Sequence, residues 1–249
     1  MKYGIIGAGN VGLTIGYYLY KNNISINIFT RDIKAKKEYY SSIPKNIFTE
    51  DFNTFIDSLD YVFLAIPDHS IDNIVQKIIE RNGIPIILFS GSYKPRRNNV
   101  FTLHPAASFP YPIFDVGFIN KIVFTSEQNE TIKHIEKELH INVITIRNRN
   151  ILYHTAAMIA SNFITILLFA ANNIMKKFTI NDEDSNIILK SLSLTSLEAY
   201  FKFHKFSGPV ERDDQNLIKQ YFKALKGSNE LDIFKSIIKY SKILKNEKK

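Results

Sequence analysis

A glycine-rich hexapeptide near the start of the chain has the spacing needed to hold a phosphate. Gly7-Ala8-Gly9-Asn10-Val11-Gly12 follows a short β-branched run and opens a helical pattern, and a second apolar run follows within about 30 residues. Gly7 permits a tight turn, Gly9 lets the backbone approach a pyrophosphate, and Gly12 lets helix and strand pack closely. The helix N-terminus adds N–H groups and a positive dipole. We therefore expect a dinucleotide rather than an unliganded turn, bound by Gly7, Gly9, Asn10, Val11 and Gly12.

The end of the second expected strand indicates which dinucleotide is bound. An acidic residue there binds ribose hydroxyls and favours NAD, whereas an arginine accommodates a 2′-phosphate and favours NADP. Thr30 and Arg31 come first and Asp32 follows. This order favours NADPH, bound by Thr30 and Arg31. The alternative is that Asp32 binds the ribose, or that it only caps the next helix.

Two further strand ends are expected to line the cofactor, because ligands in open α/β sheets lie at the carboxyl ends of strands. His69 follows one of these ends, and although it could be catalytic, we expect an exposed turn residue. The expected contacts come from Ala65, Ile66, Pro67 and Ser90.

A histidine and a polar stripe are candidates for the substrate side. His104, in "TLHPAASF", can bind a carboxylate or carry a proton, or it is a packed loop histidine. In the most apolar long stretch, residues 153–175, His154, Ser161, Thr165 and Asn172 fall within about 20° of one line at helical spacing. Its unbroken apolar run is shorter than the ~20 residues of a membrane span. We expect a helix packed on three sides, with its stripe facing a cleft or a partner helix. The alternative is that these side chains bond to neighbouring helices.

A later segment, "FSGPVERDD" (206–214), has the composition of a break followed by a helix start. Pro209 suits the first turn, and the acidic residues Glu211, Asp213 and Asp214 suit the helix dipole. Arg212 is less expected in an acidic first turn and could hold an anion.

The order of these segments predicts two domains. Short β-branched runs alternate with helical stretches in the first half, which argues for a parallel sheet with helices on both faces. From Ile151 onward the spacing is helical. We place the boundary in "RNRN", giving a Rossmann domain over residues 1–148 and an all-helical domain over residues 149–249. The expected strands are 3–7, 25–30, 61–67, 85–90, 100–104 and 121–126.

Composition narrows the function. The 249-residue chain has no cysteine, which excludes disulfides and thiolate chemistry, and no metal site is expected. The net charge is +8, but the sequence has no basic block with interleaved aromatic residues. A small anionic ligand therefore explains the excess charge better than nucleic acid does. The N-terminus indicates a strand and turn rather than a signal peptide. We expect a cytoplasmic protein without a membrane span.

Six motifs in order, GxGxxG, "AIPD", "SGS", "HPAASF", "YHTAAMIASN" and "SGPVERDD", resemble Rossmann-like proteins with a C-terminal DUF2520 domain. That group is related to ketopantoate, pyrroline-5-carboxylate and prephenate enzymes, and it includes an alternative type of ketopantoate reductase. The resemblance implies a Rossmann domain and a helical domain similar to the C-terminal domain of 6-phosphogluconate dehydrogenases, with catalysis between them.

The resemblance also implies site residues. Ordinary ketopantoate reductases carry a proton-donating Lys and two substrate-orienting Asn at i, i+4 and i+8, and here those positions hold His154, Met158 and Asn162. Asn162 matches, Met158 removes a polar contact, and His154 can still donate a proton. A Ser and a Glu later in the family suggest Ser207 and Glu211, although their spacing differs.

The resulting prediction is NADPH-dependent reduction of a small anionic 2-oxo acid, most concretely 2-dehydropantoate to pantoate in pantothenate synthesis. His154 is the expected general acid and His104 its alternate. Another oxo-acid or imine reductase, a prephenate-type dehydrogenase and a non-catalytic NAD(P)-binding sensor are the alternatives. A homodimer through the helical domain is expected, because its long apolar helices exceed what one small domain buries.

Overall fold

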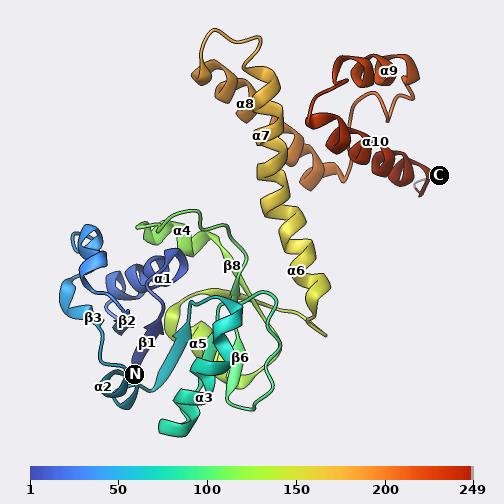
Figure 1. Ribbon diagram of the computed structural model, residues 1–249. Coiled ribbons are helices and arrows are strands. Elements are labelled where there is room, and N and C mark those ends of the chain that lie inside the picture. Colours follow the sequence, from blue (N-terminus) through green and yellow to red (C-terminus); the bar gives the residue numbers. More distant parts are fainter. Residues whose placement is uncertain (248–249) are drawn as a thin grey trace. The chain divides into compact units, whose positions relative to one another are not determined.

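The structure is a computed structural model that describes residues 1–247 (Figure 1). The chain forms two compact units, which divide between Asn162 and Phe163. The boundary expected from the sequence, between residues 148 and 149, lies earlier in the chain. The division into a cofactor part and a substrate part therefore stays a prediction.

The first unit contains a six-stranded sheet in which every pairing is parallel. Its order, with β1 in the interior and the chain running outward in both directions, is that of a Rossmann fold. The expected α/β fold is confirmed. In spatial order the strands are β3 (Phe48–Thr49), β2 (Ser25–Phe29), β1 (Lys2–Ile6), β4 (Tyr61–Leu64), β5 (Ile86–Leu88) and β6 (Val100–Thr102).

Helices cover both faces of this sheet, because its central strands are apolar on both sides. On β4, Phe63 packs into one core while Val62 and Leu64 pack into the other. The first core contains α1 (Asn10–Lys21), α4 (Val116–Lys121) and α5 (Glu130–Leu139); the second contains α2 (Phe52–Asp57) and α3 (Ile71–Arg81). Short 3₁₀ turns precede some of these elements: η1 (Lys34–Tyr39), η2 (Lys45–Ile47) and η3 (Asp68–Ser70).

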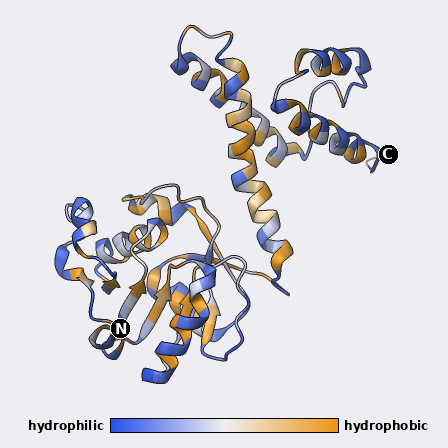
Figure 2. Ribbon diagram, viewed as in Figure 1, coloured by the Kyte–Doolittle hydropathy of each residue, from blue (hydrophilic) through white to orange (hydrophobic). Residues whose placement is uncertain are grey.

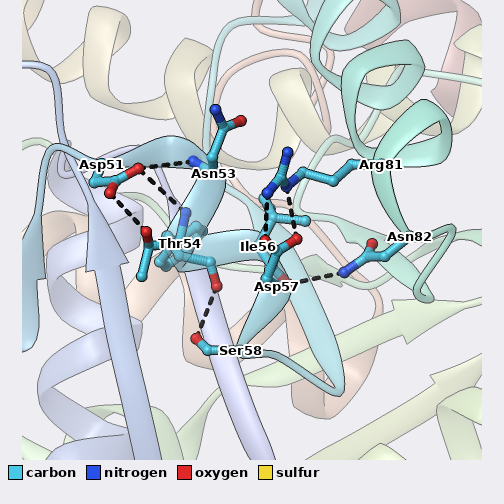
Figure 3. A network of polar contacts seen from close by, with 9 residues as sticks. Asp51, Asn53, Thr54, Ile56, Asp57, Ser58, Arg81 and Asn82 are labelled. Carbon is cyan, nitrogen blue, oxygen red and sulfur yellow. Dashed lines mark hydrogen bonds and ion pairs between the residues drawn. The ribbon is translucent and has the colours of Figure 1, made fainter.

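A polar network ties α2 to the end of α3 (Figure 3). Asp51 caps α2 by accepting from the backbone N–H groups of Asn53 and Thr54, both at 3.1 Å. Arg81 forms a two-pronged ion pair with Asp57, one prong being Nε to Oδ1 at 2.6 Å. Asn82, which ends α3, donates to the carbonyl of Ile56 at 2.8 Å. Both helices of the second core are therefore fixed at their ends.

A second, three-stranded sheet was not expected. The predicted strand 121–126 lies in this sheet rather than in the parallel one. It pairs antiparallel with β7, because the chain turns at His104 and Pro105 after leaving β6. The strands β3 and β9 are too short or too polar to stand out in the sequence. The second sheet consists of β7 (His104–Pro105), β8 (Val123–Ser126) and β9 (Asn142–Thr145).

The described chain after Asn150 is helical, as predicted. Its elements are α6 (Ile151–Met158), a π-helical turn η4 (Ile159–Phe163), α7 (Ile164–Met175), α8 (Asp182–Phe203), α9 (Gln215–Ala224) and α10 (Glu230–Glu247). The helix predicted to begin at Pro209 instead begins at Gln215, where Asp214 caps it by accepting from Leu217 N–H at 3.0 Å. Asp213 has φ of 59°, a left-handed conformation that interrupts a helix begun at Pro209.

The helical run Ile151–Met175 carries apolar residues along its length (Figure 2). The expectation that it is packed on three sides is not met, because none of its described residues is buried. It is long and apolar enough to cross a membrane by length and composition, a test that core helices of soluble proteins also pass. Its polar stripe is interrupted by η4, since a π turn rotates each residue less than an α turn does.

Candidate functional site

A cavity of about 760 Å³ opens at the carboxyl ends of β1, β2 and β4. This volume lies in the range of pockets that hold small molecules and cofactors. Its lining joins three strand ends that the sequence analysis selected separately. Seven predicted cofactor residues line it: Gly7, Gly9, Thr30, Arg31, Ala65, Ile66 and Pro67.

The glycine turn has the geometry that phosphate binding requires. Gly7 has φ of 112°, and a Cβ there would lie 2.3 Å from the carbonyl oxygen of Ala65. A Cβ on Gly9 would meet no atom within 4 Å, so this backbone faces open space. Gly9 is also the N-cap of α1 and provides no side-chain cap. The first turn of α1 can therefore direct N–H groups at a phosphate.

Arg31 and Asp32 have different environments. Arg31 is exposed and lines the cavity together with Lys36 and Lys77. The Oδ1 of Asp32 accepts from the backbone N–H of Ala35 at 3.0 Å, which is the capping role considered as an alternative. Asp32 still lines the cavity, but three cations surround the same space. This arrangement favours an additional phosphate on the ribose.

Four predicted cofactor residues do not line the cavity. Asn10 donates through Nδ2 to the carbonyl of Phe109 at 2.9 Å. Val11 packs against the first core. A Cβ on Gly12 would lie 1.8 Å from the carbonyl oxygen of Gly7, so Gly12 serves the packing of helix on strand. The fourth, Ser90, belongs to a neighbouring polar cluster.

That cluster is built around a hydrogen-bonded chain of three side chains. The Nδ1 of His104 lies 2.8 Å from the hydroxyl of Tyr153, which lies 2.5 Å from the hydroxyl of Thr125. These residues come from β7, from the first turn of α6 and from β8. Pairing of β7 with β8 sets His104 directly opposite Thr125, so the second sheet positions two of the three groups.

His104 is neutral at physiological pH. Burial, the charge of Arg149 and the charge of His154 lower the pKa of His104 from 6.5 to about 4, and Asp68 only partly opposes them. A neutral imidazole is a poor proton reservoir but a good hydrogen-bond donor or acceptor. The role of His104 as the alternate general acid stays a prediction. The low pKa of His104 argues against a protonated imidazolium at neutral pH.

His154 faces the same position as His104. A Cβ on Gly91 would lie 2.5 Å from Nδ1 of His154 and 2.9 Å from Nε2 of His104. The two rings meet edge to face, with their centroids 6.1 Å apart. Nδ1 of His154 is buried and has no hydrogen-bond partner in the described chain. Both histidines predicted as proton carriers therefore converge on the segment after β5 that contains Ser90, which was predicted to contact the cofactor.

Arg149, Tyr153 and Thr125 were not predicted from the sequence. Arg149 lies in the predicted polar boundary between the domains, yet it is only 8% exposed. Its Nη2 donates to the carbonyl of Ser90, and its guanidinium lies 5.6 Å from the centre of the Tyr153 ring. The position of Tyr153 next to His154 in sequence was the one available signal, whereas Thr125 gave none.

Asn162 lies in the π turn η4 and is exposed. Its Oδ1 accepts from the hydroxyl of Ser161 at 3.0 Å, and that hydroxyl also donates to the carbonyl of Ala157 at 2.6 Å. Asn172, on the same predicted stripe, instead accepts from the buried Ser185 of α8 at 2.6 Å. For Asn172, the alternative that these polar side chains bond to neighbouring helices is therefore correct. π turns are frequent at functional sites, which agrees with a special role for the Asn162 segment.

The remaining predicted residues, Ser207, Glu211 and Arg212, lie in the second unit. All three are exposed and precede α9. The backbone N–H of Arg212 donates to the carbonyl of Gly208 at 3.3 Å, which forms part of an irregular turn. Their roles at a substrate stay predictions.

Comparisons with known families agree with this architecture. Residues 2–87 match the family described as NADP oxidoreductase coenzyme F420-dependent, and residues 122–240 match a domain of unknown function, DUF2520. The chain joins a Rossmann segment of the NADP oxidoreductase type to a DUF2520 segment. The expected family resemblance and the expected cofactor class, NADP, are confirmed. No curated protein matches the chain in sequence.

Solved structures with the same fold include three informative examples. A candidate NADP oxidoreductase from Bacteroides fragilis has a TM-score of 0.73 at 16% identity, with 97% of each chain covered. Pyrroline carboxylate reductase from Plasmodium falciparum, solved with NADP bound, has a TM-score of 0.64 at 12% identity, with 98% of each chain covered. 1-Pyrroline-5-carboxylate reductase from Streptococcus pyogenes has a TM-score of 0.63 at 14% identity, with 97% of this chain and 98% of that chain covered. This chain thus shares its fold with these three proteins.

Proposed function

We propose that this protein is an NADPH-dependent reductase of small 2-oxo acids, and that 2-dehydropantoate, which would give pantoate for pantothenate synthesis, is its substrate. The observation that carries the proposal is the pairing of two features in the first unit. One is the dinucleotide cavity with Arg31 at its ribose end. The other is the polar cluster of His104, Tyr153 and His154 at the Ser90–Gly91 segment.

The residues present fit the cofactor. The N-terminus of α1 and the open backbone at Gly9 suit a pyrophosphate, and Arg31 with Lys36 suits a 2′-phosphate. The strand-end residues Ala65 and Pro67 would lie along the cofactor toward the nicotinamide. When bound, NADPH supplies a hydride to the carbonyl carbon of the substrate.

The protein must then protonate the carbonyl oxygen as negative charge develops on it. His154 is the proposed donor, because its unpartnered Nδ1 is directed at the Gly91 segment and burial with nearby charge lowers the pKa of its neighbour, His104. The hydrogen bond between His104 and Tyr153 fixes the orientation of both rings beside His154. Asn162 is proposed to orient the substrate, with Ser207 and Glu211 as further contacts implied by the family resemblance.

A kinetic panel tests the proposal. Purified protein is given NADPH and a series of 2-oxo acids that includes 2-dehydropantoate, and NADPH oxidation is followed by absorbance. The expected result is a kcat/KM for 2-dehydropantoate that exceeds the values for the other acids. Reduction of another acid alone would move the proposal to that substrate, and binding of NADPH without its oxidation would favour an NAD(P)-binding sensor.

A cyclic imine carboxylate is the second candidate substrate. The fold likeness to pyrroline carboxylate reductases favours this class, since an imine carbon accepts a hydride as a ketone carbon does. The same panel therefore includes 1-pyrroline-5-carboxylate. Preference for this compound over every 2-oxo acid would replace the ketone proposal by the imine one.

A further inference from the structure

A buried guanidinium with unused hydrogen-bond donors lies beside the two histidines. Arg149 is 8% exposed, and its Nε and Nη1 are buried without a hydrogen-bond partner. Arginine keeps its charge in proteins, and burying an unpaired charge is unfavourable unless an acceptor compensates for it. Among residues 1–247, no carboxylate forms an ion pair with this guanidinium. The chain itself therefore leaves part of a strong anion-binding group unsatisfied.

Several contacts hold Arg149 in place without using these donors. Its Nη2 donates to the carbonyl of Ser90, its backbone N–H donates to the carboxylate of Glu127 at 3.2 Å, and its guanidinium lies over the ring of Tyr153. The next residue, Asn150, caps α6 by accepting from Leu152 N–H at 2.9 Å. The position of the guanidinium is thus fixed by backbone and ring contacts rather than by a countercharge.

The residues that carry these unpartnered nitrogens meet at one short segment. Arg149 contacts Ser90, and Nδ1 of His154, which also lacks a partner, lies against Gly91. Nε2 of His104 meets the same glycine. After burial, the positive charge of Arg149 is the next cause of the lowered pKa of His104. One end of this cluster therefore offers a cation and the other offers imidazole nitrogens.

We propose that the Arg149 guanidinium binds the carboxylate of the substrate through one of its unpartnered N–H groups, with His154 and His104 facing the adjacent carbon that is reduced. Nε and Nη1 donate from different edges of the guanidinium, so each can form one charge-assisted hydrogen bond to a carboxylate oxygen. In a small 2-oxo acid the carboxylate is bonded directly to the carbonyl carbon. Both nitrogens are covered by protein atoms, so the ligand enters as neighbouring side chains shift. The inference rests on the proposed function for the reaction, but not for carboxylate binding.

The first test measures binding without catalysis. Oxamate, a carboxylate that resembles a small 2-oxo acid and is not reduced, is titrated calorimetrically into the protein saturated with NADPH. Arg149→Gln is expected to weaken oxamate binding by about 10–150-fold, the equivalent of a charged hydrogen bond of roughly 1.5–3 kcal/mol. Arg147→Gln removes the same charge from an exposed position two residues away and is expected to change nothing. Equal affinity in Arg149→Gln and the unaltered protein overturns the proposal.

A second test separates binding from folding. If Arg149 is only structural, Arg149→Gln lowers Tm but leaves the preference for charged ligands intact. The unaltered protein is therefore compared with Arg149→Lys for the ratio of kcat/KM between 2-dehydropantoate and its neutral lactone. The proposal requires this ratio to fall at least tenfold in Arg149→Lys, and an unchanged ratio contradicts it. If no ketone is reduced yet oxamate binding still depends on Arg149, the proposed reaction fails while the carboxylate site stands; if the unaltered protein does not bind oxamate, the carboxylate site fails.

Discussion

The Nδ1 of His104 lies 2.8 Å from the hydroxyl of Tyr153, and this bond links the second sheet to the first turn of α6. The hydroxyl of Tyr153 also bonds to Thr125, so its proton can be directed toward either partner. Since His104 is neutral near pH 7, its ring can accept from Tyr153 through Nδ1 while Nε2 carries the proton that faces Gly91. The direction of this bond therefore sets which nitrogen of His104 carries the proton.

The lowered pKa of His104 predicts an acid-sensitive stability. An unfolded chain binds this proton near pH 6.5, whereas the folded protein binds it only near pH 4. The unfolded state therefore binds more protons between these values, and the contribution of His104 is full above about pH 6.5 and lost as pH falls toward 4. This pH-dependent change in the free energy of unfolding is on the order of 3 kcal/mol.

Denaturant unfolding of the protein and of His104→Gln at several pH values measures this contribution. The variant should show a shallower loss of stability between about pH 6.5 and about pH 4. Parallel curves for the two proteins would mean that His104 titrates normally in the folded state.

Replacing the two histidines should distinguish the proton donor from its neighbour. His154→Gln is expected to lower the reductive rate by about 10²–10⁴-fold and to abolish the fall in rate with rising pH. His104→Gln should keep the fall in rate with rising pH, because a group with a pKa of about 4 does not change charge near neutrality. The measurement is kcat/KM against pH for both variants. If the fall in rate with rising pH is lost in His104→Gln and kept in His154→Gln, His104 is the proton donor.

Arg31 should determine the preference for NADPH. It lines the cavity at the ribose end, while the carboxylate of Asp32 is engaged with the backbone of Ala35. Arg31→Ala should weaken NADPH binding by about 10–150-fold and NADH binding much less. Lys37→Ala removes a charge from the same exposed turn without lining the cavity and serves as the control. Fluorescence titration of both cofactors measures the effect, and equal losses for NADPH and NADH would sink the assignment.

Asn162 should act on the reaction rather than on the fold. It is exposed in the π turn, and its Oδ1 accepts from the hydroxyl of the neighbouring Ser161. Asn162→Ala is expected to lower kcat/KM by about 10²–10³-fold with little change in Tm, as for the loss of one donor at a reacting oxygen. Thr155→Ala, at another exposed polar position of the same helical run, is the control. A large fall in Tm with near-normal kinetics would show that Asn162 is structural.

The sequence predicted the cofactor side better than the substrate side for a physical reason. The turn at Gly7 and the strand end at Arg31 are local features, in which spacing along the chain determines geometry. The cluster of His104, Thr125 and Arg149 depends on the second sheet, whose short strands carry little periodic signal. The lowered pKa of His104 depends on burial by residues distant in sequence. The π turn at Asn162 has no pattern that separates it from an α-helix.

The apolar surface of α7 and α8 is the basis for the expected homodimer. Phe169 of α7 is 67% exposed, and Phe201 of α8 is 72% exposed. Monomeric soluble proteins rarely expose large contiguous apolar patches. α7, Ile164–Met175, carries no charged side chain, so two copies can pair along it without repulsion between like charges. We propose that a second copy of the chain covers this surface.

Sedimentation velocity tests that proposal directly. The unaltered protein should sediment with about twice the 28.7 kDa of one chain. Phe169→Glu should shift it toward the monomer, because a charge placed in an apolar interface loses its hydration without gaining a partner. Ser191→Glu adds the same charge to α8 at an exposed polar position and should leave the dimer intact. A monomeric protein that pellets with lipid vesicles, and loses this behaviour in Phe169→Glu, would instead assign the apolar surface to a membrane.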